Sequence, residues 1–328
     1  MKQVMWATTA FVVSLAFLST YFLTPKLIEV FKKNAITGTD VHKLERPERA
    51  EMCGLGAVVG FAGALSVAVL LMPLDRVILG VVLSVVSASL VGVLDDLYGL
   101  RQRHKVLLLF VAAVPLSLAL RSHTTLAVPL LGAVDFGIMF PLVLVPIGIS
   151  GASNLTNMLA GFNGLEAGIG GVALGAVALS GLVMGNFACF LIGTTMAAAL
   201  GAFLVYNWYP AKAFPGDAGT LAIGACLACA VIVGEIEFLG VLLLLPHILD
   251  FVMKSFSGRK QGKPFGQRMV YGDTKVSNDG ILQPPPYLSV PHLVMKAMPV
   301  TERGLVWVLL LFEGLVGVAA VLISSWVM

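Results

Sequence analysis

Residues 77–94 read VILGVVLSVVSASLVGVL, without one charged side chain, and Asp95 and Asp96 follow directly. A helix needs about 20 mostly apolar residues to cross the hydrocarbon core of a bilayer, so this stretch predicts a membrane span that ends in two carboxylates. The whole chain has the same character, since 58% of its 328 residues are hydrophobic and 12% are charged. Soluble domains carry about 25% charged residues, and disordered chains are poor in apolar ones. The sequence therefore excludes both classes and predicts an all-α polytopic membrane protein.

Further apolar runs bring the expected number of transmembrane helices to about ten. The expected spans are about 4–24, 54–72, 77–94, 105–120, 137–153, 168–185, 187–206, 218–234, 238–253 and 304–326. Between the fourth and the fifth, residues 122–136 contain β-branched residues with Pro129 and Gly132, which favours a short hairpin outside the bilayer. We expect a single integral membrane domain over residues 1–328, with a long loop at about 254–303.

The basic residues are distributed unevenly over the loops between these spans. Ten spans place both termini on the same side of the membrane. Eighteen of the 21 Lys and Arg residues then fall in four loops of the other side, 26–52, 95–105, 207–217 and 254–303. Because cytoplasmic loops carry an excess of Lys and Arg, we expect these loops to be cytoplasmic and the termini to be non-cytoplasmic. The net charge of +3 is too small to indicate nucleic-acid binding.

Polar residues gather where the spans meet the expected cytoplasmic loops. Ionisable groups near membrane depth are costly and suggest function by default. Three segments carry the polar residues: Asp95-Asp96 with Lys105, then Asn154, Asn157, Asn163 and Glu166, and finally Asp217. Each segment alone is also explained by an ordinary helix end, and Asp217, after Pro215-Gly216, equally by a helix N-cap. Their number in so apolar a chain favours one shared polar cavity.

The residue types indicate the chemistry of such a cavity. Carboxylate and amide oxygens suit Mg²⁺, which takes one or two protein ligands together with phosphate oxygens and water. Neighbouring Arg and Lys side chains suit phosphate groups. The sequence thus predicts phosphoryl transfer with a partner dissolved in the membrane. A secondary transporter is the alternative. However, transporters place polar groups near the midplane in two related halves, whereas here they gather at one face without a visible repeat.

Three motifs, in this order, resemble one enzyme family. They are Asp95-Asp96 with Leu100-Arg-Gln-Arg-His-Lys105, Asn154-x-x-Asn157-Met-Leu-Ala-Gly-Phe-Asn163-Gly-Leu-Glu166-Ala-Gly, and Asn207-Trp-Tyr-Pro210 with Phe214-Pro-Gly-Asp217. With the ten expected spans, they resemble the polyprenyl-phosphate N-acetylhexosamine-1-phosphate transferases over nearly the whole chain. Bacterial relatives usually read Asp-Gly-Leu-Asp-Gly where this chain reads Asn163-Gly-Leu-Glu-Ala167. The resemblance is therefore closest to the eukaryotic and archaeal dolichyl-phosphate GlcNAc-1-phosphotransferases.

The resemblance implies a role for each motif residue. It implies that Asp217 and Asn157 hold Mg²⁺, with Mn²⁺ as an alternative, against the pyrophosphate of UDP-GlcNAc. Asn163 would bond the uracil and Phe214 would stack on it. In the implied catalytic set, Lys105 binds the phosphate of the lipid acceptor, while Asp95 and Asp96 position or activate that phosphate. The remaining residues implied to bind the nucleotide sugar are Asn154, Glu166, Lys263 and Arg268.

The chain departs from the family in its long loop, where the family carries a basic box that usually contains histidine. Here the basic segment runs from Gly258 to Arg268 without one. Lys263 and Arg268 are therefore the candidates for its charge, and the identity of the hexosamine stays open.

The resemblance also implies the reaction and its place. GlcNAc-1-phosphate would pass from UDP-GlcNAc to dolichyl or another polyprenyl phosphate, with release of UMP. Another UDP-HexNAc as donor, or undecaprenyl phosphate as acceptor, is the alternative. The site would face the cytoplasm, in the cell membrane of an archaeon or bacterium or in the endoplasmic reticulum membrane of a eukaryote. A homodimer is a further expectation.

Overall fold

The computed structural model describes residues 2–120, 123–128, 132–260 and 274–327. Helices make up most of it: α1 (Lys2–Lys33), α2 (Leu55–Leu71), α3 (Val77–Tyr98), α4 (Gln102–Ala112), α5 (Val114–Ala119), the π-helix η1 (Phe140–Leu144), α6 (Val145–Met158), α7 (Leu165–Val183), α8 (Phe187–Asn207), α9 (Gly216–Val233), α10 (Glu237–Leu243), α11 (Leu245–Lys260), α12 (Val290–Ala297) and α13 (Glu302–Val327). Three antiparallel strand pairs complete it: β1 (Thr37–Thr39) with β2 (Glu48–Ala50), β3 (Thr125–Val128) with β4 (Gly132–Asp135), and β5 (Lys275–Val276) with β6 (Leu282–Gln283). This architecture confirms an all-α polytopic membrane protein.

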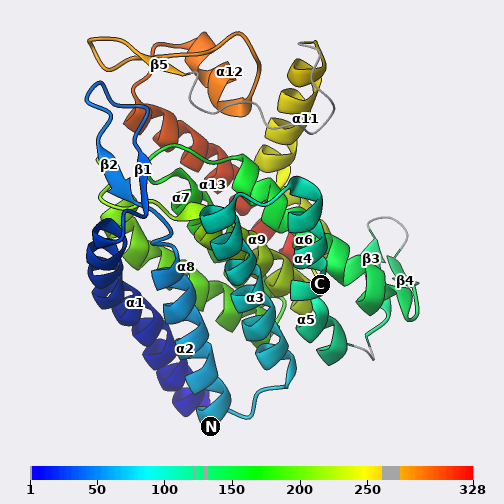
Figure 1. Ribbon diagram of the computed structural model, residues 1–328. Coiled ribbons are helices and arrows are strands. Elements are labelled where there is room, and N and C mark those ends of the chain that lie inside the picture. The colour runs from blue at the N-terminus through cyan, green and yellow to red at the C-terminus, as the bar shows by residue number, and fades with distance from the viewer. Residues whose placement is uncertain (1, 121–122, 129–131, 261–273, 328) are drawn as a thin grey trace.

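Helix α9 lies within the bundle, packed against α2, α3, α6, α7 and α8 (Figure 1). Every residue from Ala218 to Ile232 is buried. Gly, Ala and Cys dominate its sequence, and small side chains let neighbouring helices approach closely. A Cβ atom on Gly92 of α3 would collide with the backbone of Asp217, and one on Gly224 would collide with the carbonyl of Ala152 on α6. Two glycines thus set the spacing of three helices that carry the site.

All ten expected spans coincide with helical segments. Helix length alone, however, does not establish that the chain crosses the membrane ten times. Seven described helical segments are long and apolar enough to cross a membrane when α4 and α5 are taken together as one, and α10 with α11 makes an eighth if the bent pair is one span. Helix α2 is shorter, with 17 residues, and the fifth expected span is divided between η1 and α6. A count of ten therefore stays a prediction.

The ninth expected span, 238–253, is broken. Helix α10 ends at Leu243, and α11 begins at Leu245 with its axis turned by 56°. Pro246 explains the break, because proline has no N–H to donate to the preceding turn and its ring clashes with the carbonyl four residues earlier. Helix α11 then continues to Lys260, so the expected loop 254–303 begins inside a helix and also contains β5, β6 and α12.

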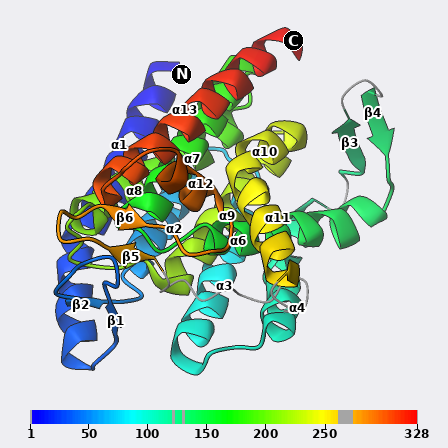
Figure 2. The same cartoon turned by 90° about the horizontal axis from the view of Figure 1, so that it is seen from above.

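The hairpin expected at 122–136 is present as β3 and β4, which pair from Thr125 with Asp135 to Val128 with Gly132. It projects from the side of the bundle (Figure 2). The same view shows the beginning of α1 and the end of α13 at one edge of the molecule, opposite β1 and β2. The side of the membrane on which the two termini lie stays a prediction.

Candidate active site

The N-terminus of α9 is capped by a side chain of α3. Oδ1 of Asp96 accepts a hydrogen bond from the backbone N–H of Asp217 at 2.8 Å, and Oδ2 accepts one from Ala218 at 3.0 Å. A helix N-terminus presents unpaired N–H groups and a partial positive charge, and a carboxylate satisfies both. Helix α9 begins at Gly216 with Pro215 as its N-cap residue, so Asp217 lies inside the first turn and not at the N-cap position. The N-cap interpretation of Asp217 is therefore wrong, and its carboxylate is left for other contacts.

Lys105, in the first turn of α4, lies between two carboxylates. Its Nζ forms one ion pair with Oδ2 of Asp95 and another, at 2.6 Å, with Oδ2 of Asp217. Lys105 is 3% exposed, and a buried ammonium group is tolerated when it is paired. Asp95 also accepts a hydrogen bond from the N–H of Leu100 at 2.7 Å, which fixes the turn between α3 and α4. We call Lys105, Asp95 and Asp217 the Lys105 triad.

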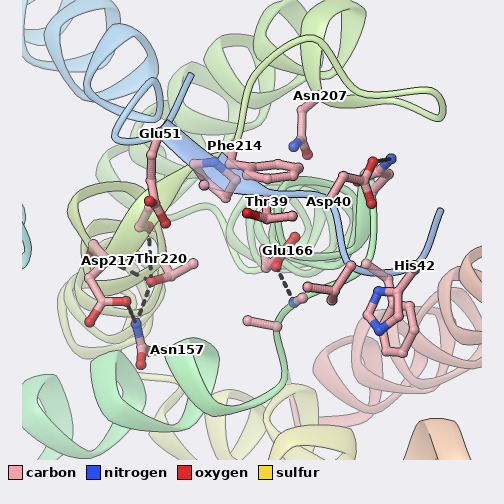
Figure 3. A pocket seen from close by; sticks show the side chains of 18 residues that line it. Thr39, Asp40, His42, Glu51, Asn157, Glu166, Asn207, Phe214, Asp217 and Thr220 are labelled. Carbon is pink, nitrogen blue, oxygen red and sulfur yellow. Dashed lines mark hydrogen bonds between the residues drawn. The ribbon is translucent and has the colours of Figure 1, made fainter. Parts of the chain in front are cut away.

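Asn157, near the end of α6, makes a second contact with Asp217. Its Nδ2 donates to Oδ1 of Asp217 at 2.6 Å and to Oγ1 of Thr220 at 2.8 Å. Thr220 stands three residues after Asp217 on α9, so both side chains face α6. Figure 3 shows the three side chains converging. Residues from all three motifs thus come together where α3, α4, α6 and α9 meet.

A first cavity, of about 310 Å³, opens beside these residues. Figure 3 shows its two ends: Asp217, Asn157 and Thr220 at one, Asp40 and His42 at the other, with Phe214 and Glu166 between them. The segments from β1 to His42, from Ala160 to Asn163 and from Phe214 to Asp217 supply most of its wall. An elongated cavity with a polar end and an aromatic ring in its middle suits a ligand that has a charged part and a planar part.

Phe214 is positioned by backbone pairing with the first loop. Ala50 in β2 forms a parallel bridge with Ala213, and its carbonyl accepts the N–H of Phe214 at 2.8 Å. The carbonyl of Phe214 in turn accepts the N–H of Cys53 at 3.0 Å. Asn207 holds the other end of the segment by donating from Nδ2 to the carbonyl of Ala213 at 2.9 Å. The wall of the cavity is therefore built by two segments that are far apart in the sequence.

The far end of the first cavity is held by four side chains, Asp40, Lys43, Asn163 and Glu302, which we call the end-wall network. Nδ2 of Asn163 donates to Oδ2 of Asp40 at 3.0 Å, and the Asn163 N–H donates to Oε1 of Glu302 at 2.8 Å. Lys43 pairs with Glu302 and, at 3.4 Å, with Asp40. Asp40, Asn163 and Glu302 are each 3% exposed. The network fixes both the backbone and the side chain of Asn163.

Glu166 closes the connection between α6 and α7. Its Oε1 accepts the N–H of Gly161 at 2.6 Å, across a turn in which Gly161 and Gly164 have φ angles of 108° and 85°. These left-handed conformations favour glycine, which has no Cβ to clash. The turn explains why glycines flank Asn163, and it brings Asn163 and Glu166 to the same cavity.

A second cavity, of about 740 Å³, lies on the other side of the Lys105 triad. Its walls come from α4, α6 and α11, and most of them are apolar, including Phe110, Ile147, Ile248 and Phe251. Asp95 and Lys105 line it, whereas Asp217 lines the first cavity, and Asn157 lines both. The two cavities therefore meet where the Lys105 triad and Asn157 lie.

Burial shifts the pKa of two groups in the first cavity. It raises the pKa of Glu51, and the negative charge of Asp217 raises it further. It lowers the pKa of His42 to about 4, and Lys43 adds to this while Asp40 and a hydrogen bond to the backbone of Gly161 oppose it. The His42 ring stacks on Phe162 with their centroids 4.4 Å apart. At neutral pH, His42 is consequently an uncharged wall of the cavity.

The structure brings most of the residues expected from the sequence to one place. Asp95, Asp96, Lys105, Asn157 and Asp217 lie together, and the first cavity is lined by Asn163, Glu166 and Phe214. Asn154 is placed differently from the expectation: it lines the second cavity, where its Oδ1 accepts from Nε2 of Gln102 at 2.8 Å. Lys263 and Arg268 lie outside the described residues, so their role stays a prediction.

The first cavity also has lining residues that sequence reasoning missed. They are Thr39, Asp40, His42, Glu51 and Thr220. Four of them belong to the first loop, whose polar composition resembles that of any solvated loop. Thr220 carried a signal, because it follows Asp217 by three residues on a helix. The other four line the cavity because β2 pairs with the segment before α9, and this pairing could not be recognised from the sequence.

The residues at the junction of the two cavities fit a magnesium ion in type, since Asp217, Asn157 and Thr220 offer carboxylate, amide and hydroxyl oxygens, which are hard ligands. The described residues contain no group of three or more His, Cys, Asp or Glu side chains suited to a metal. A cation would therefore depend on phosphate oxygens for the rest of its shell, as Mg²⁺ does at phosphoryl-transfer sites.

A membrane-embedded helix bundle in which a polar cavity and an apolar cavity share a lysine–carboxylate centre defines a membrane phosphoryl-transfer enzyme. Residues 78–235 match the model of the family described as glycosyl transferase family 4, and the chain belongs to this family.

Three relatives show the breadth of the match. A protein of Saccharolobus solfataricus, provisionally named UDP-N-acetylglucosamine–dolichyl-phosphate N-acetylglucosaminephosphotransferase, is 33% identical over 317 residues, 95% of each chain. The enzyme of that name from Dictyostelium discoideum is 29% identical over 265 residues, 71% of this chain and 64% of its own. The phospho-N-acetylmuramoyl-pentapeptide-transferase of Halalkalibacterium halodurans is 31% identical over 201 residues, 57% of this chain and 62% of its own.

Proposed function

We propose that this protein transfers GlcNAc-1-phosphate from UDP-GlcNAc to a dolichyl-type polyprenyl phosphate, forming a lipid-linked GlcNAc diphosphate and releasing UMP. The family and the names of its relatives support the reaction class. One structural observation carries the proposal for this chain. A polar cavity with an aromatic wall and a larger apolar cavity meet at Lys105, Asp217 and Asn157. A water-soluble nucleotide sugar and a lipid phosphate need such a junction to react.

The reaction needs a phosphate oxygen of the acceptor close to the β-phosphorus of the donor. The oxygen forms a new bond to this phosphorus, while the bond from the phosphorus to the oxygen bridging it to the α-phosphate breaks, and UMP leaves. The acceptor phosphate is already ionised at neutral pH, so positioning and charge compensation account for the catalysis without a proton acceptor. Lys105 is placed to provide that charge from the junction of the cavities.

Each carboxylate near Lys105 has a separate role in this proposal. Asp95 and Asp217 hold the ammonium group at the junction until phosphate oxygens replace one of them as its partners. Asp96 acts through α9, because both of its oxygens are taken by backbone N–H groups. Asp96 is therefore a positioning residue, while Asp95 and Lys105 face the second cavity, where the acceptor phosphate would lie.

Mg²⁺, or Mn²⁺ in its place, belongs to the proposal as the cofactor that Asp217 and Asn157 would hold. When bound, it would offset the negative charge of the two reacting phosphates. Asn157, which also donates to Thr220, holds the Asp217 carboxylate in place. Asp217→Asn keeps the volume of the side chain and removes its charge, so we expect turnover to lose its dependence on Mg²⁺ and to fall by about 10²-fold or more. Asp279→Asn, on an exposed turn, is the matched control.

The test of the reaction uses the full chain in detergent with Mg²⁺, a UDP-sugar and a polyprenyl phosphate, and it measures the UMP released and the lipid-linked product. UDP-GlcNAc, UDP-GalNAc and other UDP-HexNAc donors, each with dolichyl and undecaprenyl phosphate, would identify the sugar and the lipid. UMP release that requires the lipid phosphate supports the proposal. No UMP from any of these pairs would refute it.

The cytoplasmic position of the site is the finer part of the proposal, supported by the bias of Lys and Arg toward the loops around it. A cysteine introduced at the exposed Lys212, in a variant without the four native cysteines, can be probed with a membrane-impermeant thiol reagent. We expect labelling in inverted vesicles and none in right-side-out vesicles, while the opposite pattern would place the site on the other side. The mass of the detergent-solubilised protein would test the expected homodimer.

A further inference from the structure

The amide of Asn163 can be oriented from its partner alone. A carboxylate accepts hydrogen bonds and does not donate them, so the group of Asn163 that faces Asp40 is the NH₂ and not the oxygen. Nδ2 lies 3.0 Å from Oδ2 of Asp40. Lys43, 3.4 Å from the same Asp40 oxygen, pairs with that carboxylate and holds it in place. The contact with Asp40 therefore determines which end of the amide is available to a ligand.

The oxygen Oδ1 is the end of the Asn163 amide that remains available to a ligand. Asn163 lines the first cavity, and no other described residue donates a hydrogen bond to Oδ1. The backbone of Asn163 is fixed independently by Glu302, at 2.8 Å from its N–H. The end-wall network thus presents a hydrogen-bond acceptor whose direction is locked from two sides.

The position of this acceptor corresponds to the base of a nucleotide. Its partner Asp40 lies at the opposite end of the first cavity from Asp217 and Asn157, and Phe214 lies between the two ends (Figure 3). If the phosphates lie at the Asp217 end, the planar base passes the Phe214 ring and its edge reaches Asn163. Uracil presents an imide N–H at N3, whereas cytosine presents an acceptor at the same position.

We propose that Asp40, supported by Lys43, is a positioning residue that fixes the Asn163 amide as an acceptor and thereby makes the enzyme select uridine over cytidine nucleotides. This inference rests on the proposed function, because it takes a nucleotide sugar as the occupant of the first cavity. Asp40 need not touch the base, since it acts through Asn163. A cytosine in the same pose would set its N3 lone pair against Oδ1 and leave both acceptors without a donor.

Asp40→Asn tests the inference directly, because an amide at position 40 can donate as well as accept. Asn163 can then turn its amide and present Nδ2 to the cavity, which suits cytosine. We expect the ratio of kcat/KM for UDP-GlcNAc to that for CDP-GlcNAc to fall by roughly 10-fold or more, mainly through KM. Affinities for UMP and CMP, measured by calorimetry, should converge in the same way. Glu45→Gln, an exposed carboxylate of the same loop, should leave both ratios unchanged.

The outcomes separate this inference from the proposed function. Wild-type protein that binds neither UMP nor CMP and releases no UMP refutes the proposed function. Wild-type protein that turns over UDP-GlcNAc and CDP-GlcNAc equally well overturns the inference alone. The same holds if Asp40→Asn weakens both nucleotides to the same extent, since Asp40 would then have a merely structural role. Should Asp40→Asn fail to fold, Asn163→Ala provides the test: loss of uridine affinity without loss of cytidine affinity supports the inference, and equal losses overturn it.

Discussion

The carboxylate of Asp96 holds the backbone of Asp217 across 121 residues of sequence, with Oδ1 at 2.8 Å from the Asp217 N–H. This bond and its neighbour to Ala218 place the first turn of α9 against the end of α3. The Asp217 side chain is thereby directed to Lys105 and Asn157. The adjacent acids Asp95 and Asp96 consequently differ in role, because one faces an ammonium group and the other a helix N-terminus.

Asp96→Ala should reduce both stability and turnover. It leaves two N–H groups of α9 without an acceptor, which costs about 1–2 kcal/mol of unfolding free energy. It also loosens the position of Asp217, for which a loss of about 10²-fold in kcat is expected. Ser89→Ala is a matched control, since it removes another α3–α9 hydrogen bond, from Ser89 Oγ to the carbonyl of Ala218 at 2.9 Å. Thermal melting and UMP release measure the two effects. An Asp96→Ala variant with the kcat of the control would contradict the positioning role.

Gly92→Ala should disturb the same contact by overpacking. A Cβ atom at this position would meet the carbonyl of Asp217 and Cα of Ala218, so the two helices must separate, at about 1–3 kcal/mol. Gly175→Ala in α7 makes the same chemical change where no atom lies within 4 Å of the added Cβ. We expect a lower melting temperature and lower turnover for Gly92→Ala, and an unchanged or slightly higher melting temperature for Gly175→Ala. Equal melting temperatures would show that α3 can move away without cost.

Lys105→Met should be the most damaging substitution at the junction of the cavities. The variant leaves Asp95 and Asp217 facing each other without a cation, and breaking a buried ion pair in this way costs about 3–5 kcal/mol. It also removes the charge proposed to meet the acceptor phosphate. Lys212→Met, an exposed lysine of the segment before α9, is the control. Melting curves and kcat/KM for the lipid acceptor test this. A variant that binds the lipid as well as the wild type does would assign the acceptor phosphate to another group.

Stability should depend on pH through His42. Its pKa is about 4 in the folded protein, because burial disfavours the charged ring, against 6.5 in the unfolded chain. As the pH falls from about 6.5 to about 4, the unfolded chain therefore takes up a proton that the folded protein does not, and the free energy of unfolding decreases. His42→Gln should lose less melting temperature than the wild type between pH 7.5 and pH 5. Parallel losses would mean that His42 is protonated in the folded state.

The residues of the candidate site differ in how far the sequence predicted them. Asp95, Lys105, Asn157 and Asp217 stand out because ionisable and amide groups are rare in so apolar a chain, and the junction contains all four. Asp40 could not be recognised, since one acid in a polar loop carries no local signal. Its contact with Asn163 spans 123 residues, and it depends on the turn at Gly161 and Gly164 and on the start of α13.

The sequence by itself determined the class of the protein, its helical spans, the hairpin and the motifs of the site, because hydropathy, charge distribution and turn residues act over short stretches of chain. The tertiary structure decided the role of each polar group. Packing of α3, α6 and α9 at Gly92 and Gly224 made Asp96 a cap and Asp217 a partner of Lys105, and it placed Asn154 in the second cavity. These are contacts between residues far apart in the chain, and whether a carboxylate pairs with a backbone N–H, an ammonium group or an amide depends on which of them packing brings within about 3 Å.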